Sequence, residues 1–522
     1  MRAIHVRILI AVLIVVCVGF VLSSQADEAL GQSLTGWTEP ITLGDGWFPN
    51  ISVDATGRIH VSWAGTILSK VDQQGDPSKA YDVVWYTNSM DGANWAPTED
   101  LVALQQVPVG NSEVTRPNMF VDPDGTFHIT FRSFDVFYAQ ARYANRIMAS
   151  ELENVFRANI NDWGYFSQSL KDNDGVLHLV FTENVQTEKC PICYQVFYRR
   201  STDNGETWSN RNPISLATTG AAKPQMLISG TGAIHVVFES GVGGTLGKVS
   251  NVDSTVLHTV SYDDGVTWEP AKEFMPLYRD IKKNVAIAQD RMGQLIVVWL
   301  RSSTNRLYYQ ISRDDGRTWT EAVPIYGVSG RWKAVNTGQD GYAMENDSLD
   351  MVHLVFVGRH KQNQEGLDVL HMAWNGDSWS DADVVAEYVG DVPEWPRIAV
   401  GLGNQLHVVW FTRDAKHVWT SDDGEAIYQI HYARGMADAP AIAPKAYSYL
   451  APTRQPSPTP PAQATATATA MVASLTQEPL DPNAPVYIRS ENDELISIGL
   501  SLAVPAILII IMAAIVFRVR NG

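Results

Sequence analysis

The chain has 522 residues, of which 45% are hydrophobic, and it contains 16 tryptophans and 38 glycines. This composition can fill a large core and excludes a wholly disordered protein. Its 39 basic and 57 acidic residues give a formal charge of -18. This charge argues against a nucleic-acid partner, because phosphate-binding sites need a cationic face. Three cysteines cannot form a disulfide scaffold, so apolar packing must supply the stability.

The N-terminus has the pattern of a secretory signal peptide over residues 1–26. Arg2 and Arg7 precede an uncharged run over residues 8–22, and small residues precede the cleavage expected after Ala26. An uncleaved N-terminal anchor is the alternative, because the run is long for a signal peptide. Either segment predicts that the rest of the chain is exported.

Residues 36–440 contain a recurring phrase of two short β-forming runs joined by a turn, the second run reading Leu-His-Val-x-Trp/Phe or a close variant. Such a phrase is typical of a β-hairpin. Successive copies begin about 50 to 68 residues apart, which leaves room for two further strands in each repeat. Seven copies are present, at residues 51–63, 119–131, 169–181, 226–238, 286–299, 344–356 and 398–410.

A second phrase, Ser-x-Asp-x-Gly-x-Thr-Trp, predicts a turn that precedes the outer strand of a repeat. The Asp and Ser side chains can bond to nearby backbone groups, Gly supplies a positive φ, and Trp packs on the sheet. Weaker copies at residues 88–95 and 372–379 keep the Gly and Trp but lack the Asp at its expected position. We expect a structural role for the residues of the three full copies: Asp203, Gly205, Trp208, Asp263, Gly265, Trp268, Asp314, Gly316 and Trp319.

The predicted fold is all-β, a seven-bladed β-propeller of four-stranded blades. The segment 36–43 resembles the last strand of a repeat but precedes the first hairpin, so we expect this N-terminal strand to close the last blade. The alternative is a turn at residues 420–426, which would make the last blade self-contained.

The C-terminal region predicts a membrane anchor. Residues 441–494 form a stalk whose central part is rich in Pro, Thr and Ala, and residues 495–517 carry no charge over 23 positions, enough for one transmembrane helix. Arg518 and Arg520 follow the helix, so residues 518–522 are expected to be a cytoplasmic tail. The prediction is a single-pass cell-membrane protein with its propeller on the extracellular side.

The Asp-containing turn phrase, repeated within a propeller pattern, resembles the Asp-box of the sialidase-like superfamily, also called bacterial neuraminidase repeat proteins. In sialidases this resemblance implies six blades, an arginine triad for the substrate carboxylate, a Tyr/Glu nucleophile pair and an Asp acid/base. Here Trp47 stands where the first arginine is expected, and Arg116-Pro117 does not match the family's arginine phrase. Asp76 or Asp82 is similar in placement to the acid/base, within a degenerate motif.

A ligand site is expected on the rim opposite the Asp-boxes, near the ring axis. Glu183 and Glu239 are the candidate catalytic carboxylates, with Asp76 as a third, if the rim hydrolyses a glycosidic bond. The alternative is that these charges only solvate loop ends or pair with each other. Charged and tryptophan side chains suit a sugar ligand, and the expected binding residues are Arg132, Arg301, Arg359, Arg413, Trp47, Trp332 and Trp395.

The recurring histidines are expected to form structural hydrogen bonds between blades and to bind no metal, because one lies in the same place in nearly every repeat and metal ligands must converge on a point. They are His60, His128, His178, His235, His353 and His407. Cys190 and Cys193 predict a local disulfide; a zinc knuckle or a redox pair is the alternative. No cofactor is expected.

Three functions fit these features. The first is a membrane-anchored module that binds a glycan or glycoprotein, which the missing arginine phrase favours. The second is an exo-glycosidase of sialidase-like type that uses rim carboxylates. The third is a scaffold for other envelope proteins, which predicts an exposed apolar patch.

Overall fold

The computed structural model describes residues 36–68, 80–105, 115–122, 125–133, 135–142, 153–154, 164–185, 194–215, 220–241, 254–275, 280–331, 341–360, 365–414 and 428–445. All of them belong to one compact unit that ends at Leu450. The predicted signal peptide, transmembrane helix and tail, and the stalk beyond residue 445, lie outside the described residues. Within the described ranges, no helix is long and apolar enough to span a bilayer.

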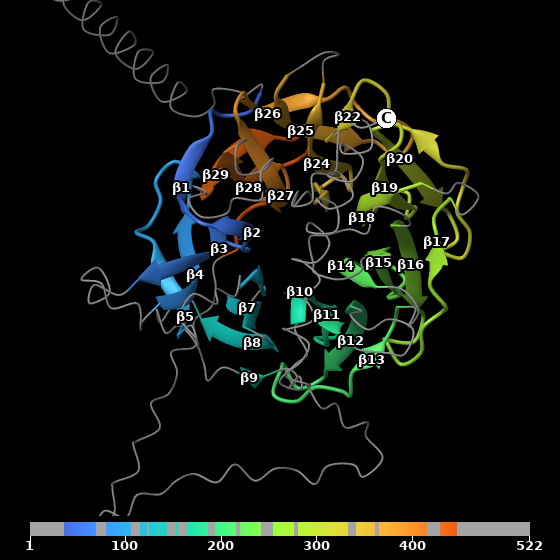
Figure 1. Ribbon diagram of the computed structural model, residues 1–522, viewed down its shortest axis with the longest axis horizontal. Coiled ribbons are helices and arrows are strands. Elements are labelled where there is room, and N and C mark those ends of the chain that lie inside the picture. Colours follow the sequence, from blue (N-terminus) through green and yellow to red (C-terminus); the bar gives the residue numbers. More distant parts are fainter. Residues whose placement is uncertain are drawn as a thin grey trace, which may run out of the picture. The chain divides into compact units, whose positions relative to one another are not determined.

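The described residues form seven antiparallel sheets arranged in a ring (Figure 1), and six of these sheets have four strands each. Five of the four-stranded sheets follow chain order. Their strands are β2 (Trp47–Val53), β3 (Ile59–Leu68), β4 (Ala80–Ser89) and β5 (Glu99–Gln105); β6 (Asn118–Val121), β7 (Thr126–Ser133), β8 (Asp135–Arg142) and β9 (Glu153–Asn154); β10 (Gly164–Lys171), β11 (Leu177–Asn184), β12 (Tyr194–Ser201) and β13 (Asn212–Pro213); β14 (Ala221–Ile228), β15 (Ile234–Ser240), β16 (Thr255–Ser261) and β17 (Lys272–Glu273); and β18 (Lys282–Gln289), β19 (Leu295–Arg301), β20 (Arg306–Ser312) and β21 (Val323–Pro324).

The sixth four-stranded sheet joins the two ends of the propeller sequence. It has the order β1 (Ile41–Asp45), β29 (Tyr428–Met436), β28 (Gln405–Asp414) and β27 (Asp391–Gly401). Strand β1 pairs antiparallel with β29, so Ile41 lies opposite Tyr432. The N-terminal strand therefore takes the outer position in the last sheet, as predicted, and the alternative of a self-contained last blade is not needed.

The remaining sheet has five strand segments, β22 (Ser329–Gly330), β23 (Ala343–Asn346), β24 (Val352–Arg359), β25 (Leu367–Trp374) and β26 (Asp383–Tyr388). Both β22 and β23 pair with β24, at opposite ends of that strand. Residues 331–342 intervene between them, so the position of one inner strand is shared by two short segments.

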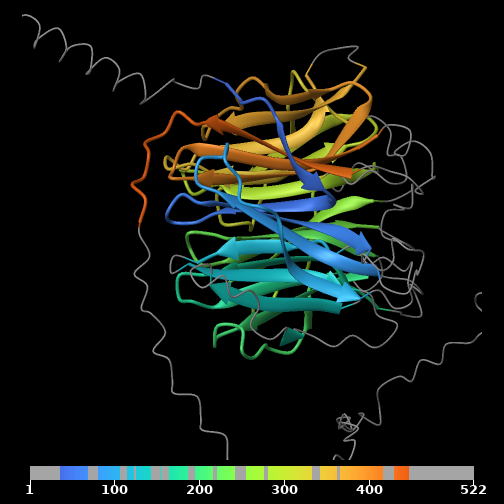
Figure 2. The ribbon, with the colours of Figure 1, turned by 90° about the vertical axis from the view of Figure 1, so that its left-hand side faces the viewer.

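The molecule is a β-propeller whose first strands lie nearest the middle of the ring, as β2, β10, β14, β18 and β27 do in Figure 1. The side view in Figure 2 shows that the strands run roughly along the ring axis. In each sheet the first and third strands run in the same direction. The turns after both strands therefore lie on one face, which we call the Asp-box face, and the first strands begin at the opposite face.

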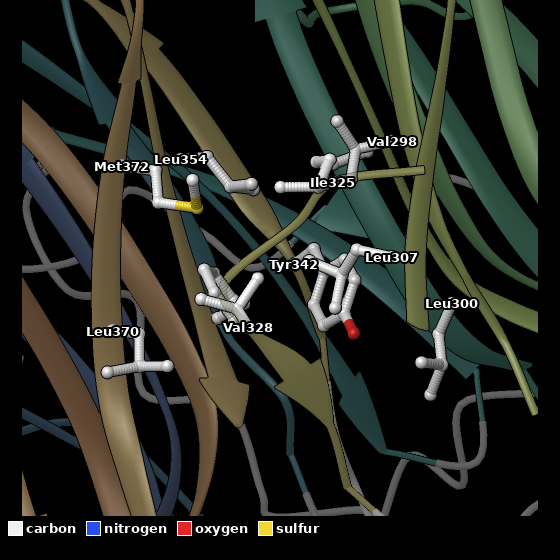
Figure 3. Packing of buried hydrophobic residues seen from close by; sticks show 11 residues of the cluster. Val298, Leu300, Leu307, Ile325, Val328, Tyr342, Leu354, Leu370 and Met372 are labelled. Atoms are coloured by element: carbon white, nitrogen blue, oxygen red, sulfur yellow. The ribbon is translucent and has the colours of Figure 1, made fainter. Parts of the chain in front are cut away.

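The core lies between neighbouring sheets, where alternate side chains of adjacent blades interdigitate. In the cluster of Figure 3, Val298, Leu300 and Leu307 from one sheet pack against Leu354 and Leu370 from the next, and all five are fully buried. Fully burying a side chain of this size stabilises the fold by about 1.5 to 3 kcal/mol. Apolar packing between blades therefore holds the ring together without a disulfide framework.

The full Asp-boxes form the predicted turns. In the second copy, Ser261 Oγ donates to Asp263 Oδ1 at 2.8 Å and accepts from Gly265 N at 2.8 Å, while Thr267 N and Oγ1 donate to the Asp263 carboxylate at 2.8 and 2.6 Å. Equivalent bonds tie the boxes of Asp203 and Asp314. Each aspartate is used in a turn, consistent with the expected structural role.

The prediction that residues 88–95 lack the box aspartate is wrong. Asp91 accepts from Asn94 N at 2.7 Å and from Ser89 Oγ at 3.1 Å, and Gly92 N donates to Ser89 Oγ at 2.9 Å. This box is one residue shorter between Asp and Gly, which hid the aspartate from the spacing used to find it. In the other weak copy, Asn375 accepts from the backbone of Asp377 and Ser378.

The recurring histidines take part in structural hydrogen bonds. His60 lies 3.0 Å from Asp54 in the adjacent turn and 2.8 Å from the Tyr86 hydroxyl on the third strand. Most of these bonds lie within one blade rather than between blades as expected, although His235 reaches Asp315 of the next sheet at 3.0 Å. Among the described residues, no three His, Cys, Asp or Glu side chains form a group that could hold a metal ion.

Candidate functional site

A cavity of about 300 Å³ runs along the centre of the ring, at the lower end of the usual range for ligand pockets. It is lined by residues of the innermost strands β2, β6, β10, β14, β18, β23 and β27. Its wall is rich in amide and hydroxyl groups, among them Asn50, Ser52, Ser167, Gln168 and Gln225. Such a wall favours a polar ligand with many hydrogen-bonding groups.

A β-bulge near the start of the inner strand recurs in five of the sheets. A bulge inserts an extra residue and changes the direction in which its side chain is presented. Lys223, Asn284 and Trp395 occupy these bulges with φ values of 51°, 57° and 55°, and all three line the cavity. The bulges therefore set which side chains reach the axis.

Amide side chains from three successive inner strands bridge neighbouring blades below the bulges. Asn50 Oδ1 accepts from Met119 N at 2.9 Å, Asn118 Oδ1 accepts from Ser169 N at 3.0 Å, and Gln168 Oε1 accepts from Met226 N at 2.6 Å. On three later inner strands the corresponding residues are Ala286, Ala343 and Arg397, as judged from strand register. Two small side chains and one cation thus replace the amide on that side of the channel.

A second polar group joins the sheets that contain β14 and β18. Glu239 Oε1 accepts from Asn284 N at 2.8 Å and lies 3.4 Å from Lys223 Nζ. The Asn284 side chain is 97% buried, and its Nδ2 has no hydrogen-bond acceptor among the described residues. A buried donor without a partner is costly, so this amide is poised to donate to a ligand in the cavity.

Arg397 carries the second positive charge of the cavity wall. Its guanidinium lies 4.0 Å from the centre of the Trp395 ring and donates to Pro396 O at 2.9 Å, and within the described ranges it has no carboxylate partner. The Trp395 ring is held in turn by Phe48 and Phe166, at centroid distances of 5.1 and 5.6 Å. Burial lowers the pKa of Arg397 to about 9, which leaves it charged at neutral pH.

Glu345 lines the same cavity from β23. Glu345 is exposed to the channel, and desolvation by the surrounding protein raises the pKa of its carboxyl group to about 7. In the part of the chain that the structure describes, the carboxylate has no hydrogen-bond or ion-pair partner. A neutral or ionised Glu345 could therefore bond to a ligand.

Of the six charged residues predicted to ring the axis, the structure brings only Glu239 to the cavity lining. All six lie on second strands, one strand further from the axis than the first strands, and the other five take part in local contacts. Arg132 is 97% buried, Glu183 pairs with Arg211, Arg301 pairs with Asp280, Arg359 donates to Glu365 O, and Arg413 pairs with Glu394. These five residues do not line the cavity, and the ligand-binding and catalytic roles expected of them remain predictions.

The other predicted site residues divide between the cavity, the core and the undescribed segments. Trp395 lines the cavity, although its ring is in contact with other side chains rather than open on all sides. Trp47 packs edge-on against Tyr428 at 5.0 Å in the core of its sheet. Asp82 is buried in β4. Asp76, Trp332, Cys190 and Cys193 lie outside the described residues.

A recurring sequence signal could have identified the cavity residues. Three of the inner strands carry proline directly after the cavity or bulge residue, at Phe48-Pro49, Lys223-Pro224 and Trp395-Pro396, and Arg116-Pro117 precedes a fourth. Proline cannot donate to a sheet ladder and is confined to edges and bulges. A proline inside a predicted inner strand therefore marks the bulge whose side chain is redirected.

Comparisons with known proteins agree with the fold. A family model described as a BNR repeat-like domain matches residues 167–427. No curated protein matches the chain significantly in sequence. Among solved structures, a protein of unknown function from Dyadobacter fermentans aligns at 13% identity over 77% of this chain and 100% of its own, with a TM-score of 0.46. A PL25 ulvan lyase aligns at 12% identity (71% and 93%, TM-score 0.46), and the NanB sialidase of Streptococcus pneumoniae at 12% (78% and 72%, TM-score 0.42).

Proposed function

Because the chain belongs to the BNR repeat-like family of the sialidase-like superfamily, we propose that it is a cell-surface propeller that binds an acidic glycan in its axial cavity. The glycan is either free or carried by a glycoprotein, because only one end of its chain needs to enter the cavity. The binding face in this proposal is the one opposite the Asp-box face.

One observation carries the proposal: the Arg397 guanidinium faces a polar cavity without a carboxylate partner among the described residues. Its contact with the Trp395 ring holds the planar group while leaving N–H donors for a ligand. A guanidinium presents parallel donors that match a carboxylate or sulfate better than a lysine does. Lys223 adds a second cation to the same cavity wall.

The remaining wall suits the hydroxyls of a sugar. Asn284 Nδ2 offers an unused donor, and serine hydroxyls and amides of the inner strands supply both donors and acceptors. Acidic groups and hydroxyls on one ligand would use both parts of this wall. An acidic saccharide is therefore the ligand class that the cavity favours.

The membrane anchor is part of the proposal. Residues 437–445 leave the propeller along the Asp-box face, where Ile442 N donates to Leu402 O and Lys445 N donates to Ala55 O, both at 2.7 Å. A stalk and a transmembrane helix would continue from there.

We also propose that the five-segment sheet serves as a seventh blade. Its segments β22 and β23 occupy the two ends of an inner-strand position, and the insertion of residues 331–342 falls where other blades carry a bulge. Two segments in one inner-strand position give five segments without an extra strand position.

Glycoside hydrolysis is the second candidate, because the Glu239 carboxylate lines the cavity. The Glu183 carboxylate pairs with Arg211 behind the first strand, so a Glu183–Glu239 pair would not place two carboxylates in the cavity. Release of sugar from any glycan by the purified protein, and its loss in Glu239→Gln, would favour this function over binding alone.

The test is a binding screen of the exported propeller against acidic and neutral glycans, followed by titration of each bound glycan. Arg397→Gln should reduce affinity for acidic glycans by at least about 10-fold, since a hydrogen bond to a charged group contributes about 1.5 to 3 kcal/mol. The matched control is Arg317→Gln, another guanidinium on an aromatic ring, 4.2 Å from the Tyr262 centroid on the Asp-box face. Equal affinity in Arg397→Gln and the native protein would refute the proposal.

A further inference from the structure

The cavity contains a second polar position that lies deeper than Arg397. Glu345 is opposite His353 on the neighbouring strand, and Ala399 is opposite His407 at the same point of its own blade. Glu345 and Ala399 therefore lie at the same depth in the channel. Ala399 follows Arg397 by two residues, and a strand rises about 3.3 Å per residue, so Glu345 lies about 7 Å further along the channel than Arg397. Comparing the strand registers in the same way places Glu345 about 10 Å further along the channel than the bulge at Asn284.

The surroundings of Glu345 leave its carboxyl group available. The other charged residues of the cavity wall are Lys223, Glu239 and Arg397, and Glu239 is already in contact with Lys223 and with the backbone of Asn284. Beyond Glu345, toward the Asp-box face, the lining continues with Val53 and Val400, which also pack against the cores between blades. The inner end of the cavity therefore offers one carboxyl group.

We propose that Glu345 forms an inner subsite for a neutral terminal sugar, and that the acidic group bound near Arg397 belongs to the next sugar of the chain. A separation of about 7 to 10 Å between the two polar positions exceeds the length of one pyranose ring. A hydroxyl of the inner sugar would donate to Glu345. A second acidic sugar would fit poorly, because its carboxylate would lie beside Glu345.

This inference rests on the proposed function and adds the order of sugars to it. A ligand of this kind enters end-on with a neutral residue first and an acidic residue second. With one cation and one carboxyl group at different depths, a single acidic sugar should bind more weakly than the two-sugar ligand.

Three synthetic probes separate these possibilities: methyl glucuronoside, the same glucuronoside extended at O4 by neutral glucose, and the same glucuronoside extended at O4 by a second glucuronic acid. Calorimetric titration of the exported propeller should show that the glucose extension raises affinity by about 10-fold or more. The glucuronic acid extension should give a clearly smaller gain.

Glu345→Gln should remove most of the gain from the glucose extension and reduce the discrimination against the acidic extension, while affinity for methyl glucuronoside stays within about 2-fold. Glu321→Gln, an exposed glutamate away from the cavity, is the control and should change none of the three affinities. Circular dichroism and the urea midpoint verify that each variant is folded.

Equal affinities for the three probes, or a gain from glucose that persists in Glu345→Gln, would overturn the inner subsite but leave the proposed function intact if Arg397→Gln still weakens binding. Failure of the glucose-extended probe to bind would also overturn it. Loss of the Arg397 effect in the glycan screen would overturn the proposed function instead, so the two failures are distinguishable.

Discussion

Replacing Gly265 by alanine should destabilise the propeller by about 3 to 6 kcal/mol, because this Asp-box glycine docks on the preceding blade. Its φ is +79°, and an added Cβ would lie 2.2 Å from Tyr198 Cζ and Oη. Tyr198 is almost completely buried, and its hydroxyl lies 2.7 Å from His178 Nδ1. The methyl group must therefore displace a buried ring and break that hydrogen bond. The positive φ costs about 1 to 2 kcal/mol, overpacking about 1 to 3, and the lost bond about 1.

Gly232→Ala is the matched control, since its φ is +86° and nothing lies within 4 Å of the added Cβ. It shares the backbone cost but has no clash, so it should lose only about 1 to 2 kcal/mol. Urea unfolding followed by tryptophan fluorescence gives both values from the midpoints at constant m. If Gly265→Ala and Gly232→Ala are equally stable, the Asp-box turn does not contribute to docking between blades and the reasoning fails.

Three further outcomes are expected. Glu394→Ala should lower the free energy of unfolding by about 3 to 5 kcal/mol, because it leaves two buried arginines without their shared carboxylate. The surface control Glu269→Ala should change the free energy of unfolding by less than about 0.5 kcal/mol, and equal urea midpoints for the two variants would contradict this expectation. Burial lowers the pKa of His353 to about 4, whereas in the unfolded chain the histidine pKa is near 6.5, so the unfolded chain binds this proton more readily. Stability should therefore fall as pH decreases from about 6.5 to 4, and a urea midpoint that rises over this range would refute the lowered pKa of His353. Gly341→Ala should weaken binding of acidic glycans about 10-fold with little loss of stability, because its Cβ would lie 3.0 Å from the Arg397 guanidinium. If titration shows unchanged affinity for the acidic glycan, Arg397 does not contact the ligand at this position.

The repeated hairpin phrase was sufficient to predict the propeller, because each copy combines a strand period with a turn at a fixed place. Closure by the N-terminal strand was also predictable, since residues 36–43 resemble an outer strand that has no preceding strands of its own. The slot of His60 and its equivalents could be assigned a structural role because one residue per blade cannot converge on a metal.

Glu239 and Trp395 were predicted as site residues, but most of the cavity residues were not, and the reason lies in the bulges. Charges after the second strands, such as Arg301 and Arg413, form a regular pattern in the sequence but are one strand away from the axis. Lys223 and Arg397 lie on first strands, where a bulge changes which face of the strand each residue occupies. The alternation of side chains along a strand does not predict that change unless the adjacent proline is used to locate the bulge.

The most direct test of the account is the crystal structure of the propeller soaked with an acidic glycan that binds in the screen. We expect electron density for the sugar in the axial cavity, with its acidic group beside Arg397 and a polar group within hydrogen-bond distance of Asn284 Nδ2. Density on the Asp-box face or on the outer edges of the blades, with an empty cavity, would contradict it.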